Sequence, residues 1–316
     1  NSFLFASHAP KASVILIILT HGNARRIYFT FLFTHNNQYY SLAMKLKIIF
    51  TLFIATNIFA SDDLKQKLNS DLENLMPKVI EWRHDIHQYP ELGNREFRTS
   101  KKIADHLTSL DIEIETGIAY TGVVGLIKGG QPGPTIALRA DMDALPVEEK
   151  TGLPFASKVR TTYLGNDVGV MHACGHDAHV AILMGTAEFL ANNRDQLKGN
   201  VLLIFQPAEE GPPEDEGGGA KMMLQEGIFE KYKPEVIFGL HVTNIPNGVL
   251  LVKPGPAMAA ASAYRIKIKG EQTHGSTPWS GIDPIMATAQ LIESLNTVVS
   301  RRINIINNPA VVSVGL

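Results

Sequence analysis

Residues 180–207 read VAILMGTAEFLANNRDQLKGNVLLIFQP, a helical stretch followed by a short apolar strand. Residues 180–191 are rich in Ala, Leu and Met, which favour helix, and the run at 200–207 is typical of a strand buried on both faces. Similar apolar runs occur at 122–129, 135–140 and 235–240. The alternation of helices and buried strands predicts an α/β fold, with a mostly parallel sheet and flanking helices.

The segments on either side extend this pattern. Apolar residues recur at helical spacing over 62–89, interrupted by Pro77, and a second helix is expected at 95–110. From about residue 261 the pattern of apolar and polar residues changes. Residues 264–270 alternate apolar and basic side chains as a strand with one wet face does, a helix follows at 283–301, and NPAVVSVG at 308–315 predicts a further strand.

We therefore expect two domains: residues 61–258, the first part of a larger α/β domain, and residues 259–316, the start of a smaller α+β domain. The second stops at Leu316 after one helix and at most two strands, so we expect it to be truncated.

Composition excludes several classes of function. The chain has 316 residues, 45% of them hydrophobic and 19% charged, which is the balance of a globular protein. Its 29 Lys+Arg and 31 Asp+Glu give a formal net charge of -2, so we expect no nucleic acid and no anionic membrane as partner. One cysteine excludes an intramolecular disulfide. A small-molecule ligand is the default expectation.

The N-terminal region has the features of a targeting segment. Residues 44–60, MKLKIIFTLFIATNIFA, place two lysines before an uncharged apolar run and end on Ala60, which predicts a signal peptide and a periplasmic or secreted protein. The run is short of the ~20 residues that a membrane-spanning helix needs. Residues 1–43 begin without Met and are expected to be non-native upstream sequence, with the true start at Met44.

Chemically reactive side chains follow the apolar runs, where an open α/β sheet binds its ligands. ADMD follows the run at 135–140, PAEE follows the run at 200–207, His241 follows the run at 235–240, and MHACGHDAH precedes the helix at 180–191. Thiolate, imidazole and carboxylate together suit a divalent ion such as zinc, with manganese, cobalt or nickel as alternatives. The candidates are Asp141, Asp143, Cys174, His176, Asp177, Glu209, Glu210 and His241.

Spacing adds detail if the chain is extended at the site, because residues two apart then point the same way. Cys174 and His176 are expected to share a metal, while Glu209 and Glu210 divide metal binding and base catalysis between them. His84 and His87 are expected to be structural, and His172 and His179 to support the site from outside it.

Six motifs resemble the M20 metallopeptidase family, and look most like its amidohydrolase branch of hippurate hydrolases, N-acyl-amino-acid amidohydrolases and IAA-amino acid hydrolases. The resemblance runs in order from about residue 72 to the end. It implies a zinc-peptidase-like catalytic domain and a smaller dimerisation, or lid, domain through which two chains form a homodimer. The motifs are IHQYPELGNRE at 86–96, RADMDALP at 139–146, MHACGHDAH at 171–179, QPAEEG at 206–211, GLH at 239–241 and HGSTPWSGIDP at 274–284.

The resemblance also implies roles, position by position. Glu209 would be the general base, Asp143 the aspartate that orients the site, and His274 the smaller domain's histidine that reaches the substrate. Asp141 stands where other branches have a ligand histidine and is not counted as a ligand. The family's last ligand histidine follows the smaller domain and lies beyond Leu316. The implied ligands of one or two divalent ions are Cys174, His176, Glu210 and His241.

The expected function is hydrolysis of the amide bond of N-acyl amino acids by metal-activated water. Alternatives are a metal-dependent carboxypeptidase or dipeptidase of the same family and a catalytically impaired metal-binding fragment. A thiol hydrolase with Cys174 as nucleophile and His176 or His179 as base is a further rival.

Overall fold

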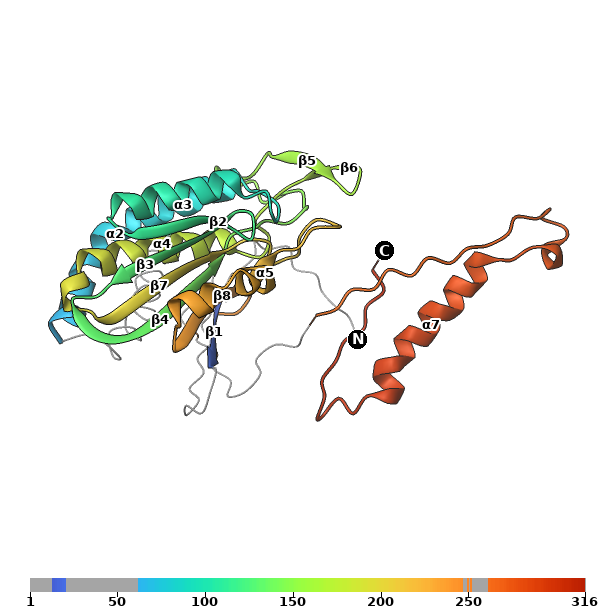
Figure 1. Ribbon diagram of the computed structural model, residues 1–316. Coiled ribbons are helices and arrows are strands. Elements are labelled where there is room, and N and C mark those ends of the chain that lie inside the picture. The colour runs from blue at the N-terminus through green and yellow to red at the C-terminus, as the bar shows by residue number, and fades with distance from the viewer. Residues whose placement is uncertain (1–12, 21–61, 247–248, 250, 252–260, 316) are drawn as a thin grey trace. The chain divides into compact units, whose positions relative to one another are not determined.

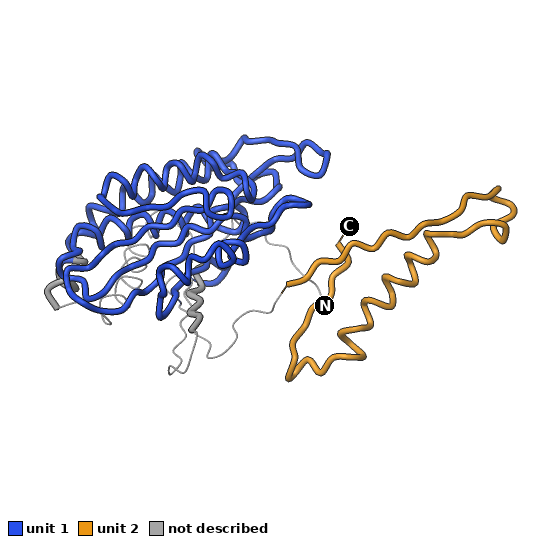
Figure 2. Tube along the Cα trace, in the orientation of Figure 1, with its two compact units in different colours: residues 1–255 blue, residues 256–316 orange. Residues whose placement is uncertain are grey.

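The computed structural model describes residues 13–20, 62–246, 249, 251 and 261–315. The chain divides into two compact units, residues 1–255 and 256–316 (Figure 2), beside a predicted boundary between 258 and 259. The predicted signal peptide at 44–60 lies outside the described residues. Among the helices that the structure describes, none combines the length and the apolar character needed to cross a membrane.

The described part of the first unit contains a six-stranded sheet in the order β1-β8-β4-β7-β3-β2 (Figure 1). Its centre is parallel: β4 pairs in parallel with β7 on one side and with β8 on the other. The outer pairs, β1–β8, β3–β7 and β2–β3, are antiparallel. The strands are β1 (Ser13–Thr20), β2 (Glu113–Ile118), β3 (Gly122–Lys128), β4 (Gln131–Asp141), β7 (Lys198–Gln206) and β8 (Val236–Thr243).

Helices cover both faces of this sheet. Alternate side chains of each strand point to opposite faces, so the apolar strands bury side chains under both layers of helices. Leu203 and Phe205 of β7 belong to the core under α2, α3 and α4, whereas Leu202 and Ile204 pack with Met223 of α5 and the start of α6. The predicted α/β fold with flanking helices is confirmed, with the parallel strands at the centre of a mixed sheet. The helices are α2 (Asp62–Gln88), α3 (Phe97–Ser109), α4 (His176–Asn192), α5 (Gly219–Gln225) and α6 (Ile228–Tyr232).

Helix α4 lies at the centre of the larger core, and Phe189 shows this most directly, with 1% of its surface exposed. Truncation of Phe189 to alanine removes a buried ring and leaves a cavity, so we expect the free energy of unfolding to fall by about 3–5 kcal/mol. Phe97→Ala is the matched control, because Phe97 is 63% exposed and should change stability by less than about 0.5 kcal/mol. Urea denaturation followed by far-UV circular dichroism measures both, and equal losses would contradict this account of the core.

Several elements differ from the expectations. Helix α2 continues through Pro77, and Gly227, whose φ is 84°, lies between α5 and α6. Residues 13–20 form an edge strand within a segment to which the sequence assigned no element. That residues 1–43 precede the natural start stays a prediction. The hairpin of β5 (Arg160–Tyr163) and β6 (Asn166–Gly169) was not foreseen.

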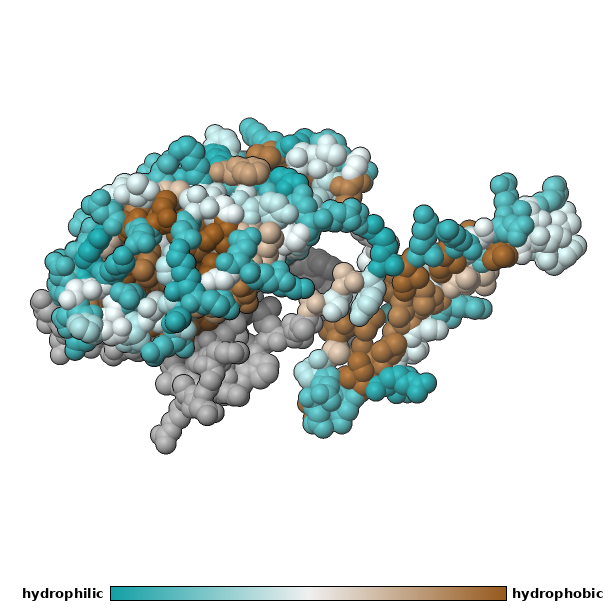
Figure 3. All heavy atoms as spheres, in the orientation of Figure 1, coloured by the Kyte–Doolittle hydropathy of each residue, from teal (hydrophilic) through white to brown (hydrophobic). Residues whose placement is uncertain are grey.

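The second unit holds the predicted helix, α7 (Pro284–Arg302), which Asp283 caps by accepting the backbone N–H groups of Ile285 and Met286. The strands predicted at 264–270 and 308–315 are not formed. A strand needs a neighbour for its backbone groups, and the described residues of this unit supply only an isolated bridge between Glu271 and Ile282. Apolar side chains of α7 are consequently exposed, Ile285 by 76% (Figure 3).

Candidate metal centre

The carboxyl ends of the three parallel strands bring the candidate residues to one edge of the sheet. Asp141, the last residue of β4, is paired with Gln206, the last of β7, and Arg139 of β4 is paired with Gly239 of β8. This register places the segments that follow each strand beside one another. The four segments singled out in the sequence do converge.

Helix α4 begins earlier than the sequence predicted, at His176, so the segment before it is not extended. Gly175 precedes the helix with a φ of 108°, and a Cβ there would lie 2.2 Å from Cγ2 of Val242. Only glycine fits this close approach of the helix to β8. The turn puts Cys174 beside β8, with its Sγ 3.2 Å from Nε2 of His241, while His176 enters the first turn of the helix.

His176 is the centre of the cluster. Its side chain is fully buried, and its Nδ1 is 3.1 Å from Oδ1 of Asp143. Its Nε2 has no hydrogen-bond partner, yet carboxylate oxygens of Asp141, Glu209 and Glu210 lie 3.6–3.8 Å away. A buried, unpartnered imidazole nitrogen facing carboxylates is the arrangement that a cation satisfies.

Among the residues that the structure describes, three groups of side chains place potential ligand atoms within 4.8 Å of one another, and His176 belongs to all three. The first is Cys174, His176 and His241, the second is His176, Glu209 and Glu210, and the third is Asp141, His176 and His179. The first two combine thiolate, imidazole and carboxylate, a donor set that fits a borderline-soft divalent ion.

The third group is different, because Asp141 and His179 already use their polar atoms on the protein. Asp141 pairs with His179 Nδ1 at 2.5 Å and with Arg139 Nη1 at 2.6 Å. His179 Nε2 accepts the N–H of Val242 at 2.8 Å, so the proton of its neutral ring lies on Nδ1. Asp141 and His179 therefore support the site from behind, and that Asp141 is not a ligand stays a prediction.

The segment that carries Glu209 and Glu210 turns sharply, so the extended chain on which the spacing argument depends is not formed here. Ala208 has a φ of 47°, in the left-handed region. The turn leaves both carboxylates 3.8 Å from His176 Nε2. Asp143 joins the parts of the site: its Oδ1 contacts His176, and its Oδ2 accepts the N–H of Glu210 at 2.9 Å.

Burial and charge change the acidities of these groups. Burial opposes protonation of His176, but the neighbouring Asp143 and Cys174 side chains and the charge of Asp141 raise its pKa to about 11. Burial and the charge of Asp141 raise the pKa of Glu209 above its ordinary value. Burial lowers the pKa of His179 to about 4, against the attraction of Asp141. The neighbouring carboxylates thus favour a positive charge at this position, which either a proton on His176 or a bound metal cation supplies.

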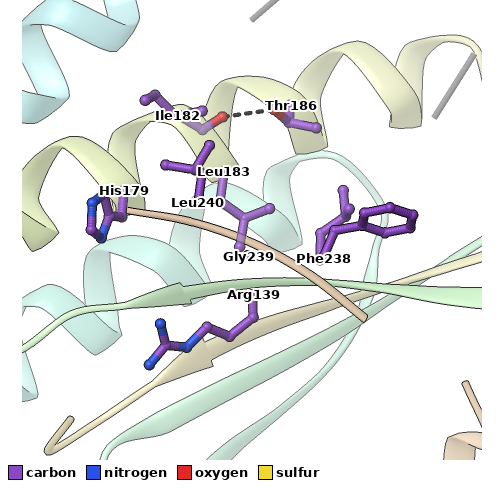
Figure 4. Close-up of a pocket in the computed structure, with 9 residues that line it drawn as sticks. Arg139, His179, Ile182, Leu183, Thr186, Phe238, Gly239 and Leu240 are labelled. Atoms are coloured by element: carbon purple, nitrogen blue, oxygen red, sulfur yellow. Dashed lines mark hydrogen bonds between the residues drawn. The ribbon is translucent and has the colours of Figure 1, made fainter. Parts of the chain in front are cut away.

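A cavity of about 460 Å³ opens beside Glu210. Its wall includes Leu92, Leu145 and Val170, together with Arg160 and Tyr163 of the β5–β6 hairpin. A second cavity, of about 20 Å³, lies between α4 and the strands β4 and β8, with His179 and Arg139 among its lining residues (Figure 4). Only the larger cavity has room for a small organic substrate.

Other candidate histidines do not join the cluster. His87 lies between Asp177 and Glu149, at 2.9 and 3.1 Å, and these carboxylates raise its pKa although burial lowers it. His84 stacks on Phe155. Neither belongs to a group of potential ligands among the described residues, and their structural role stays a prediction.

His274 belongs to the unit 256–316, where its Nδ1 lies 2.8 Å from Ser276 Oγ. Its role at the cluster stays a prediction.

The sequence gave no role to Glu96, although this carboxylate holds the segment before Glu209. Its Oε1 accepts the N–H of Ala208 at 2.8 Å. Its Oε2 accepts the hydroxyl of Thr121 at 2.6 Å. These partners are 112 and 25 residues away, so no local pattern reveals the contact. The one available signal is that Glu96 ends a motif, IHQYPELGNRE, that carries the family resemblance.

This chain is similar to proteins of a known family. The model of peptidase family M20/M25/M40 matches residues 137–312. Thermostable carboxypeptidase 1 of Saccharolobus solfataricus is 44% identical over 255 residues, covering 80% of this chain and 61% of that protein. Hippurate hydrolase of Campylobacter jejuni is 42% identical over 252 residues, covering 77% and 61%.

A solved structure of a putative aminohydrolase from methicillin-resistant Staphylococcus aureus is 37% identical, with a TM-score of 0.50 over 73% of this chain and 57% of that one. The chain thus spans about three fifths of the length of the curated relatives it matches.

Proposed function

Because the chain belongs to the M20/M25/M40 family of peptidases, we propose that it is part of a metal-dependent hydrolase of amide bonds. The observation that carries the proposal is the unpartnered, fully buried Nε2 of His176, which faces carboxylates at 3.6–3.8 Å. A cluster of this kind at the carboxyl ends of parallel strands is placed for catalysis rather than for packing.

One or two metal ions would bind to each chain. The residues that would hold them are Cys174, His176, Glu210 and His241. Zinc or manganese suits these donors best, with cobalt or nickel as alternatives. When bound, the metal supplies Lewis acidity, which lowers the pKa of a water molecule and polarises the carbonyl of the amide.

The chain's own groups would carry the proton. Glu209 stands beside the ligand Glu210 with 37% of its side chain exposed, so it can reach both the cluster and a bound substrate. It would take the proton of the attacking water and deliver it to the leaving amine. Asp143 would fix the orientation of His176 and of the Glu210 backbone. His274 would stabilise the oxyanion from the smaller domain.

We propose N-acyl amino acids as the substrates. The apolar part of the wall of the 460 Å³ cavity beside Glu210, which includes Leu92, Leu145 and Val170, suits an acyl group, and a relative at 42% identity is a hippurate hydrolase. The alternative is a carboxypeptidase, since another relative bears that name. The two activities differ in whether the amide that is cut joins an acyl group or a peptide to the final amino acid.

A chelation experiment tests the function. The chain from Ser61 onward is assayed on acetyl, benzoyl, long-chain acyl and indole-acetyl amino acids and on dipeptides, before and after chelation. Activity should vanish with the chelator and return with manganese or zinc, because the metal supplies the activated water. A chelator-resistant activity that thiol alkylation destroys would instead assign Cys174 as a nucleophile.

Two further proposals concern the whole protein. We propose that residues 44–60 direct it to the periplasm or out of the cell, and N-terminal sequencing of the product from its own host should then begin at Ser61.

We also propose that the smaller domain forms a homodimer. Sedimentation velocity of the gene product extended past Leu316 should then give twice the monomer mass.

A further inference from the structure

The loop of residues 207–211, which carries Glu209 and Glu210, is anchored from behind by a buried carboxylate. Glu96 has no exposed surface, and each of its carboxylate oxygens has a partner. One oxygen accepts the N–H of Ala208 and the other the hydroxyl of Thr121, itself 2% exposed. Hydrogen bonds to carboxylates are among the stronger ones in proteins, so this anchor is rigid.

The direction of the Glu96 side chain is informative, because Glu96 is the N-cap residue of α3 and its side chain does not cap that helix. Glu91 provides the caps instead, accepting the N–H groups of Arg98 and Thr99 at 2.9 and 2.8 Å. The carboxylate of Glu96 is therefore free to serve the 207–211 loop.

Ala208 is the residue of the loop that most needs an anchor. An L-residue other than glycine adopts a φ of 47° rarely, and such conformations persist where the surroundings impose them. The backbone at Gly93 also lies close to the loop, because a Cβ there would lie 2.7 Å from the carbonyl oxygen of Gly211. The conformation of Ala208 decides where the next two carboxylates point.

We propose that Glu96 is a positioning residue of the metal site, which holds Ala208 in its left-handed conformation so that Glu209 and Glu210 both face His176. Asp143 provides the second attachment, at the N–H of Glu210. The loop is thus fixed on both sides of Glu209. This inference rests on the proposed function, because it gives the two glutamates their roles in metal binding and proton transfer.

The chemistry of Glu96 identifies a conservative variant. Burial raises the pKa of Glu96 to about 7, although Thr121 and Ala208 act in the opposite direction. A protonated Glu96 can still accept from Ala208 and donate to Thr121, and glutamine offers the same acceptor and donor. Glu96→Gln should therefore keep the loop in place, Glu96→Ala should release it, and Glu96→Asp is too short to reach both partners.

The test uses the full chain loaded with Co(II), whose visible spectrum reports the arrangement of the ligands without any turnover. Glu96→Ala and Glu96→Asp should weaken Co(II) binding by about tenfold or more and alter the spectrum, while Glu96→Gln stays within about threefold of wild type. In the activity assay, kcat should fall by a larger factor than KM rises, because the loop contributes only Glu210 and Gly211 to the wall of the substrate cavity. The matched control is Glu188→Ala, which removes a carboxylate that pairs with Lys78, twelve residues along α4 from His176.

The outcomes distinguish a failure of the role proposed for Glu96 from a failure of the proposed function. Wild-type spectra and kcat in Glu96→Ala, or in Glu96→Asp should the alanine variant not fold, would overturn the role of Glu96. Equal losses in Glu96→Gln and Glu96→Ala would also overturn it, because glutamine preserves both hydrogen bonds. A wild-type chain that binds Co(II) but hydrolyses nothing contradicts the proposed function, and the spectra then still decide on Glu96. A wild-type chain that binds no Co(II) overturns both.

Discussion

Glu209→Gln is expected to lower kcat by about 10²–10⁴-fold while the metal content of the chain stays unchanged. Glutamine keeps the size of the side chain and one carbonyl oxygen, but it cannot take a proton from water at neutral pH. The ligands proposed for the metal do not include Glu209, so the site should fill as before. Steady-state kinetics on the best substrate of the panel, with metal analysis of the same sample, measure both quantities.

The control for this variant is Glu230→Gln, an exposed glutamate on α6 outside the cluster, which should leave kcat unaltered. If Glu209→Gln kept more than about a tenth of the wild-type kcat, general base catalysis would belong to another group. If it lost the metal as well, Glu209 would be a ligand, and the division of roles between the two glutamates would be wrong.

His176→Asn is expected to abolish metal binding and, with it, all activity above background. His176 is the one residue common to the three groups of potential ligands, and its unpartnered Nε2 faces Glu209 and Glu210. The amide of asparagine is shorter and a poor ligand for a borderline-soft ion. Metal bound per chain after dialysis, determined by elemental analysis, is the direct measurement.

His84→Asn provides the matched control, since it makes the same substitution at a histidine that stacks on Phe155 outside the cluster. It should bind as much metal as wild type. Far-UV circular dichroism of both variants separates loss of the metal from loss of the fold. A folded His176→Asn chain with a full complement of metal would show that the ligands lie elsewhere.

The fold was largely predictable because its signals are local. The run at 200–207 is apolar throughout, as a strand buried between two layers of helices must be, and it became β7. Helices α3, α4 and α7 were recognised from composition and periodicity in the same way. The strands expected at 264–270 and 308–315 show the limit of such signals, because a strand forms only where another strand pairs with it.

The sequence by itself determined which chemical groups stand at this edge of the sheet, since three of the four segments follow an apolar run within a few residues and the fourth directly precedes a helix. Only the tertiary structure decided how these groups are aimed. The left-handed turn at Ala208 brings Glu209 and Glu210 close to the imidazole of His176. The carboxylate of Asp141 is bound by Arg139 and His179. Glu96 acts on a residue 112 positions away. Contacts between residues so distant in the chain leave no periodic trace in it, because they depend on how the sheet and helices pack.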